Sequence, residues 1–190
     1  MIGKAFLCVA LISTAAFAGS RTYEISPDAK NTAEFHAEDS FDAFDGRTHK
    51  VTGGIVADPA HPSAASVEVN IDMASLDTGN SLRNREMREL YLETSKFPTA
   101  TFKSVSVAAP ESIGNNQPTE IKVTGDFTLH GVTRRITIPV RVVLIPDGRI
   151  HATSMFSVKL PEFGIHVPKN ILVTVNDEVP VRLDVWAVGR

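Results

Sequence analysis

Cysteine is almost absent from the sequence. The single cysteine, Cys8, lies within the first 18 residues and before most of an apolar run, which is the wrong position for lipid attachment at a processed N-terminus. If those residues are removed, the remaining chain has no disulfide, no thiolate nucleophile and no thiolate metal ligand. Its fold must then be stabilised by its apolar core.

Charge of one sign and long apolar runs are also scarce. The formal net charge is -3, and lysine and arginine are scattered along the chain, so no basic run is available to follow a phosphate backbone. We therefore expect no nucleic-acid partner. The apolar run near the N-terminus is too short to cross a bilayer, and we expect no stable membrane anchor.

The N-terminus has the features of a secretory signal. Lys4 precedes a mostly apolar stretch from Ala5 to Ala16, and Ala16-Phe17-Ala18 is a small-x-small cleavage pattern. We expect residues 1–18 to be a signal peptide cleaved after Ala18, and residues 19–190 to form one mature domain that is periplasmic or secreted. The alternative is an N-terminal helix packed on the domain.

Alternation of apolar and polar residues dominates the rest of the chain. This period of two indicates strands with one apolar face, and such strands are typical of antiparallel sheets. We expect strands near residues 22–25, 32–37, 50–57, 66–73, 99–107, 120–129, 134–144 and 149–160, with one or two more between 172 and 188. This pattern predicts an all-β domain, either a closed barrel or a sandwich.

One segment, residues 80–92, departs from the period of two. Asn80 or Ser81 is a suitable helix N-cap, and Met87, Leu90 and Tyr91 follow at helical spacing. We expect one short helix inserted between two strands and covering one end of the barrel. The helix could act as a moving lid or simply fill part of the core.

Residue patterns typical of catalysis are missing. None of the six histidines, His36, His49, His61, His130, His151 and His166, pairs with another at metal-ligand spacing, and no nucleophile motif stands in a suitable context. Glu86 and Glu89 lie among arginines and indicate a charged helix face. We expect no enzyme activity, no cofactor and no metal, although a site dispersed over several strands stays open.

Small residues recur on the predicted inner faces. An eight-stranded barrel is either just filled by its side chains or holds one small ligand. The small inward positions indicate spare volume but also suit the taper of a filled barrel, so both interpretations remain open here. These positions are Ala100, Ser104, Gly125, Ala152 and Ser154.

Several motifs together resemble the YceI-like family. They include Leu76–Gly79, Lys96-Phe97-Pro98, Ala100–Ser104, Gly125–Thr133 and Glu162–Ile165, in the family's order. The resemblance implies a lipocalin-like antiparallel barrel of about eight strands in the bacterial periplasm. It also implies non-covalent binding of a polyisoprenoid chain in an apolar tunnel, without catalysis, and a possible homodimer.

The sequence departs from the family pattern in two places. Arg83-Asn84-Arg85-Glu86 stands where Arg-Asp-x-His is common, and Asn31–Phe35 replaces a frequent His-Ser pair. Because those polar groups could serve a ligand's head group or the tunnel mouth, the resemblance carries over only the class of ligand.

Our hypothesis from the sequence is a carrier for an isoprenoid lipid or quinone. Arg83 and His130 are candidates for a head-group contact, although solvent exposure is the simpler expectation for each. The alternatives are a periplasmic hydrolase with a dispersed Asp/Glu/His site and a filled-core interaction module of the envelope. The expected tunnel-lining residues are Val69, Ile71, Leu90, Phe102, Phe127, Leu129, Ile138, Val140, Phe156 and Phe163.

Overall fold

The structure is a computed structural model that describes residues 19–28, 30–38, 43–166 and 176–190. The expected signal peptide, residues 1–18, lies outside the described residues, as does the first part of the expected strand region 172–188. In the described part, no helix is long and apolar enough to cross a membrane.

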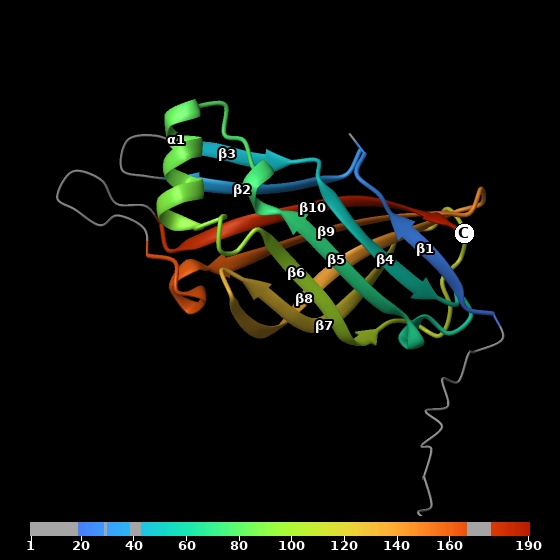
Figure 1. Cartoon of the computed structure of the whole chain (residues 1–190). Helices are drawn as coiled ribbons and strands as arrows, with labels where there is room; N and C mark the ends of the chain where they lie inside the picture. Colours follow the sequence, from blue (N-terminus) through green and yellow to red (C-terminus); the bar gives the residue numbers. More distant parts are fainter. Residues whose placement is uncertain (1–18, 29, 39–42, 167–175) are drawn as a thin grey trace, which may run out of the picture.

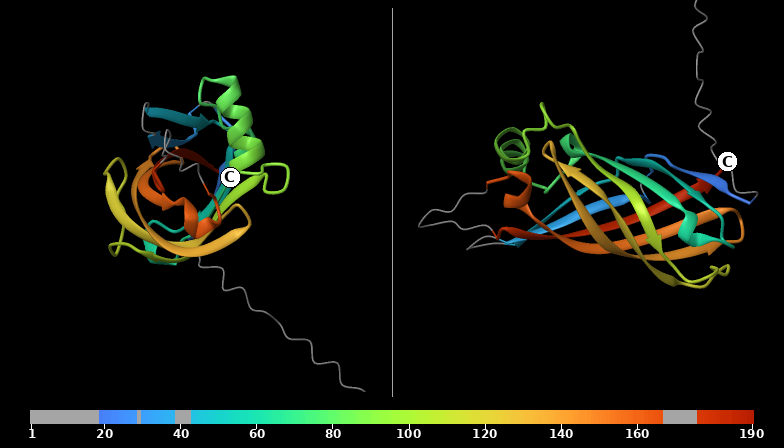
Figure 2. Two further views of the ribbon diagram at one scale, coloured as in Figure 1. Left: turned by 90° about the vertical axis from the view of Figure 1, so that its left-hand side faces the viewer. Right: turned by 90° about the horizontal axis from the view of Figure 1, so that it is seen from below.

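Ten strand segments in the described ranges form one antiparallel sheet (Figures 1 and 2). The segments are β1 (Arg21–Ile25), β2 (Thr32–Glu38), β3 (Ala43–Thr48), β4 (Val51–Ala57), β5 (Ser66–Asp72), β6 (Thr99–Ala108), β7 (Thr119–Leu129), β8 (Val132–Ile145), β9 (Arg149–Lys159) and β10 (Glu178–Gly189). The all-β antiparallel architecture predicted from alternation is therefore confirmed.

The described segments occupy eight positions around a closed barrel, because two of the strands are interrupted. β1 pairs with β4 and β2 pairs with β3, so the first two strands form one long hairpin with a break in each arm. β1 and β2 both pair with β10, at different heights along it, and this pairing closes the sheet. Figure 2 shows the resulting barrel along and across its axis.

The barrel wall opens at one corner, between β8 and β9. These strands pair only from Val140 to Ile145 and from Arg149 to Ser154. Beyond that point the short helix η4 (Leu160–Phe163) follows β9, and the ring of Phe163, 3% exposed, packs edge-on against Phe127 at 5.4 Å. Phe163 therefore packs onto the core at this corner of the wall.

Strand β3 has no counterpart among the predicted strands. Its central residues, Asp45, Gly46 and Arg47, show no alternation of apolar side chains. In this pair Phe35 of β2 lies directly opposite Gly46, where a Cβ would come within 2.2 Å of the phenyl ring. Packing of an aromatic ring over a cross-strand glycine supports the pair, and single-strand patterns do not show it.

The predicted helix is present but changes type halfway along. α1 (Ser81–Glu86) is an α-helix, and η3 (Met87–Tyr91) is a π-helical continuation in which Leu92 N–H donates to Met87 O at 2.8 Å. The wider turn shifts the side chains that follow it around the helix axis. The combined helix lies across one end of the barrel, beside β2 and β3 (Figures 1 and 2).

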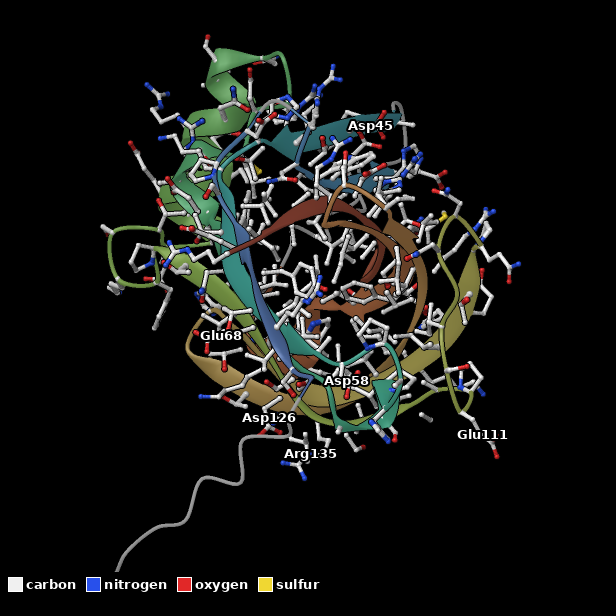
Figure 3. The ribbon with its side chains drawn as sticks, turned by 90° about the vertical axis from the view of Figure 1, so that its right-hand side faces the viewer. Asp45, Asp58, Glu68, Glu111, Asp126 and Arg135 are labelled. Atoms are coloured by element: carbon white, nitrogen blue, oxygen red, sulfur yellow. The ribbon has the colours of Figure 1, made fainter. Side chains whose placement is uncertain are left out.

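Charged side chains lie on the outside of the wall. Figure 3 looks into the barrel from the end where β10 terminates, and Glu68, Asp126 and Arg135 point away from the interior. Arg135 donates to Asp126 from Nε at 2.9 Å and from Nη2 at 3.0 Å. The inward faces are left to apolar residues, as the alternation predicted.

Candidate ligand-binding site

The helix end of the barrel is fastened to the segment that follows β5. Asn80 caps α1, and its side-chain oxygen accepts from Leu82 N and Arg83 N. Asn84 Oδ1 accepts from both Thr78 N and Thr78 Oγ1 at 2.8 Å, and its Nδ2 donates to Asp77 at 2.7 Å. Hydrogen bonds from Gly79 N–H and Asn84 hold the pKa of Asp77 below its usual range. Asn84 thus ties the first turns of α1 to the segment before it.

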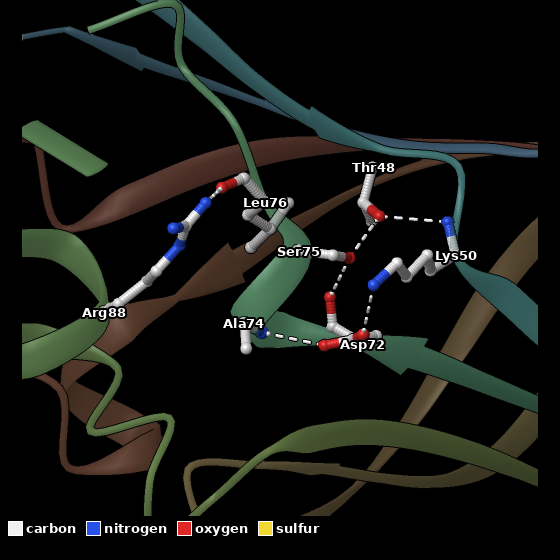
Figure 4. Close-up of polar contacts among 7 residues, drawn as sticks. All are labelled: Thr48, Lys50, Asp72, Ala74, Ser75, Leu76 and Arg88. Atoms are coloured by element: carbon white, nitrogen blue, oxygen red, sulfur yellow. Dashed lines mark hydrogen bonds and ion pairs between the residues drawn. The ribbon is translucent and has the colours of Figure 1, made fainter. Parts of the chain in front are cut away.

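Two arginines complete this attachment. Arg88 Nη2 donates to the Leu76 carbonyl at 2.6 Å (Figure 4). Arg83 donates to Thr78 Oγ1 and to the Thr78 carbonyl, both at 3.0 Å, and its guanidinium lies 3.9 Å from the centre of the Phe44 ring. Arg83 therefore joins the helix to β3 across the barrel end.

A polar network seals the wall beside this attachment (Figure 4). Ser75 Oγ donates to the Asp72 carbonyl at 2.7 Å, so Thr48, which accepts from Lys50 N at 3.0 Å, is the donor to Ser75. Asp72 in turn accepts from Ala74 N and lies 3.5 Å from Lys50 Nζ. These contacts fix the bend between β3 and β4 against the short helix η2 (Met73–Ser75).

Replacing Asn84 with alanine should loosen the helix without unfolding the barrel. The change removes three hydrogen bonds, each worth about 1 kcal/mol at a partly exposed site. Amide hydrogen exchange across residues 81–91 should accelerate by at least tenfold while exchange in β6 and β7 stays unchanged. Arg85→Ala, on the exposed side of α1, is the matched control, and equal acceleration in both variants would contradict this role.

Beneath the helix the barrel contains a partly open cavity of about 200 Å³, which we call the helix-side chamber. Its wall is mainly aliphatic and aromatic, and Glu34, Arg83 and Glu86 are its charged lining residues. Interiors of folded proteins hold few voids larger than one water molecule, about 30 Å³ of liquid. A hollow of this size and composition suits an apolar ligand. The apolar lining residues are Ala33, Phe35, Ala37, Phe44, Ile71, Met73, Leu76, Met87, Tyr91, Leu92, Ala100, Phe127, Leu129, Val158, Leu160, Ile165, Val179 and Val181.

The other half of the barrel contains a second cavity of about 110 Å³, which we call the loop-side chamber. Residues 58–65, which include the short helix η1 (Pro62–Ala64), and Ile113 close its end. Its polar lining residues include Ser154, whose hydroxyl is buried and donates to the Pro139 carbonyl at 2.6 Å. Because that hydrogen bond is satisfied within the wall, Ser154 offers the chamber no free donor, and Asp58 is the charged residue of an otherwise mainly apolar lining.

Most of the residues predicted to line a tunnel line one chamber or the other. Ile71, Phe127 and Leu129 lie in the helix-side chamber. The loop-side chamber contains Val69, Phe102, Ile138 and Val140. Phe156 points inward and packs against both halves of the core without lining either chamber.

Leu90 and Phe163 are not where the sequence placed them. Leu90 is 65% exposed and lines neither chamber, because the π-helical turn brings Met87, Tyr91 and Leu92 onto the inner face instead. Phe163 is buried at the β8–β9 corner and borders a separate, more polar hollow there, outside both chambers. Leu90 and Phe163 were predicted with the tunnel lining, and they border neither chamber.

His130 is neither exposed nor next to a chamber. It occupies the β7–β8 turn with φ 51°, and its side chain is 12% exposed. Nδ1 lies 3.2 Å from the Phe163 carbonyl, Nε2 lies 3.1 Å from Glu93, and the ring packs on Phe97. Hydrogen bonds from Lys96 and His130 lower the pKa of Glu93. His130 therefore joins three surface segments.

The sequence did not reveal the lining contributed by β2 and by the segment after β5. Ala33 and Ala37 are buried and line the helix-side chamber, as do Met73 and Leu76. Alanine gives a weak alternation signal, and Leu76 follows η2, beyond the end of the predicted strand. Only the closed barrel brings these residues to the same cavity.

Titratable groups do not assemble a metal site in the described part of the chain. No group of three or more His, Cys, Asp and Glu side chains there is arranged to hold a metal ion. His36, on the outside of the β2–β3 hairpin, has its pKa raised by hydrogen bonds to Asp45 and Glu38. That cluster lies away from both chambers.

Comparison with known proteins places this geometry in a family. The model of the YceI-like domain matches residues 23–187, which is nearly the whole described chain. The chain belongs to the YceI-like family. Two YceI-like relatives illustrate the range: a UPF0312 protein of Pseudomonas aeruginosa is 32% identical over the full length of both chains, and Protein YceI of Escherichia coli O157:H7 is 31% identical over 73% of this chain and 70% of its own.

Other YceI-like relatives match over a shorter stretch. A UPF0312 protein of Vibrio cholerae is 43% identical over 128 residues, and the match spans 64% of this chain and 65% of the relative. A second Vibrio cholerae relative is matched over 47% of its length. The chain thus spans less than two thirds of these relatives.

Solved structures share the YceI-like fold. BcnA of Burkholderia cenocepacia superimposes with a TM-score of 0.72 at 24% identity, covering 84% of this chain and 98% of BcnA. A polyisoprenoid binding domain from Saccharophagus degradans superimposes with a TM-score of 0.68 at 17% identity, covering 90% of this chain and 99% of that domain. At these identities the likeness establishes the eight-stranded barrel fold alone.

Proposed function

We propose that the protein is a periplasmic carrier that holds the tail of a long-chain isoprenoid lipid, of the quinone or polyprenyl class, inside its barrel and catalyses no reaction. The observation that carries the proposal is the hollow interior: two apolar chambers of about 200 and 110 Å³ lie within the barrel. The alternative of an interaction module with a filled core does not account for these two chambers. The name of the Saccharophagus degradans domain supports the same class of ligand.

The chemistry of the lining suits a hydrocarbon. Burial of one methylene contributes about 0.8 kcal/mol, so a five-carbon isoprene unit contributes about 4 kcal/mol before the cost of ordering the ligand. The lining offers few polar groups that a hydrocarbon would leave unpaired. Arg83 and Glu86, which border the helix-side chamber from α1, are suited to contact a polar head group.

Location in the periplasm rests on the N-terminal pattern. Residues 1–18 have the charge, apolar stretch and cleavage pattern of a signal peptide, and residues 19–190 would be the exported carrier. A carrier in an aqueous compartment between two membranes would shield an isoprenoid tail from water during transfer.

The proposal is tested on protein purified from its native host. Organic extraction and native mass spectrometry should find one isoprenoid lipid per chain, and delipidated protein should take up an added isoprenoid quinone. A palmitate control should bind more weakly, because a saturated straight chain lacks the branches that fill an irregular cavity. Repeated recovery of lipid-free protein together with no uptake of quinone would overturn the proposal.

A further inference from the structure

The two chambers are stacked end to end along the barrel. On β5 the lining passes from Val69 to Ile71, and on β10 from Leu183 to Val181. On β6 it passes from Phe102 to Ala100. These are consecutive inward positions on strands whose side chains alternate. In the described part of the chain, no residue lines both chambers.

Three phenylalanines stand at the boundary, and we call them the aromatic partition: Phe102, Phe127 and Phe156. Phe102 lines the loop-side chamber, Phe127 lines the helix-side chamber, and Phe156 packs against the core on both sides. The rings of Phe127 and Phe156 meet edge-on with their centroids 6.1 Å apart. The partition therefore spans three strands at a single height of the barrel.

Gly125 determines where the ring of Phe102 lies in the aromatic partition. This residue is the inward position of β7 between the two chambers, and a Cβ there would lie 2.5 Å from Cζ of Phe102. The ring of Phe102 thus lies against the wall, in the space that any larger residue would fill. Phe102 and Phe127 are 7% exposed, whereas Phe156 is only half-buried, so Phe156 is the least buried ring of the partition.

The aromatic partition divides the interior into two volumes, and each is small compared with a typical ligand site. Sites that enclose drug-sized ligands have volumes of roughly 300–1,000 Å³, and each chamber alone is smaller, at about 200 and 110 Å³. We expect a short isoprenoid to enter the helix-side chamber without disturbing the partition. A long tail must pass the aromatic partition to reach the loop-side chamber.

We propose that the aromatic partition sets the preference of this protein for isoprenoid length, with the loop-side chamber as the subsite for the distal end of a long tail. The inference rests on the proposed carrier function and adds a specificity-determining position to it. Short isoprenoids occupy one chamber, and long ones occupy both.

The test compares farnesol, an alcohol of three isoprene units, with a quinone of eight isoprene units. Ala152 is buried and lines the loop-side chamber, so Ala152→Phe should fill it. We expect Ala152→Phe to weaken binding of the eight-unit quinone by at least about tenfold and to change farnesol affinity by less than about twofold. Ala152→Leu should give a smaller loss in the same direction and serves if the larger substitution prevents folding.

A second variant addresses the partition itself. Phe156→Leu should speed uptake of the eight-unit quinone by about tenfold and leave farnesol uptake unchanged, since only the long tail passes the level of the partition.

Ala108→Phe, on the exposed side of β6, is the control for the phenyl ring that Ala152→Phe adds. Circular dichroism checks that each variant is folded.

The outcomes separate the two proposals. If the wild-type protein binds neither probe, the carrier function fails and the length selection fails with it. If the wild-type protein binds both, but folded Ala152→Phe and Ala152→Leu change both affinities equally or neither, the carrier stands and the length selection is overturned.

Discussion

Ala100→Phe is expected to abolish isoprenoid binding of any length. Ala100 is 2% exposed, and its side chain lines the helix-side chamber from β6. A phenyl group there takes the place of about one isoprene unit, whose burial contributes about 4 kcal/mol. The dissociation constant for farnesol should therefore rise by about a thousandfold. Isothermal titration with delipidated protein measures the change.

The control for this substitution lies on the same strand. Ala108→Phe adds the same ring on the exposed face of β6 and should bind farnesol like the wild type. The folded state of Ala100→Phe should survive, because the ring enters a hollow and not a filled core. A folded Ala100→Phe protein with wild-type affinity would mean that the ligand does not occupy the helix-side chamber.

Phe127→Ala should cause a large loss of stability. Phe127 is 7% exposed and packs edge-on against both Phe156 and Phe163, at 6.1 and 5.4 Å between ring centroids. Removing a buried phenyl ring costs about 3–5 kcal/mol, since apolar burial is lost and a cavity remains. Urea unfolding of delipidated protein should show this decrease in the free energy of unfolding.

Leu90→Ala is the matched comparison for stability. Leu90 is 65% exposed, so its removal should change the free energy of unfolding by less than about 0.5 kcal/mol. The sequence pattern alone placed Leu90 and Phe127 together as interior residues. Equal losses for the two variants, or a loss below about 1 kcal/mol for Phe127→Ala, would contradict the core described here.

Alternation predicted the strands well because most of them have one face toward the interior and one toward water. β7 and β8 show this most clearly, and the turn between them at His130 lies where the sequence placed it. The pattern fails for β3, where Gly46 is covered by the ring of Phe35 from a neighbouring strand. Alternation of apolar and polar residues within one strand does not reveal a contact with a neighbouring strand.

The site was predicted less completely than the fold. Inward positions such as Val69 and Ile138 follow from alternation, but a period of two does not say how much space remains between opposite walls. The division of the interior depends on the Phe102 ring lying against Gly125 and on Phe127 and Phe156 meeting edge-on. The prediction for Leu90 failed for a local reason. The helix widens into a π-turn after Glu86, which changes the direction of the side chains that follow.

A crystal structure of delipidated protein soaked with the eight-unit quinone would test the central claim most directly. The account predicts continuous tail density from the helix-side chamber, past a turned Phe156, into the loop-side chamber. Density for the quinone on the outer surface, with both chambers unchanged, would contradict it.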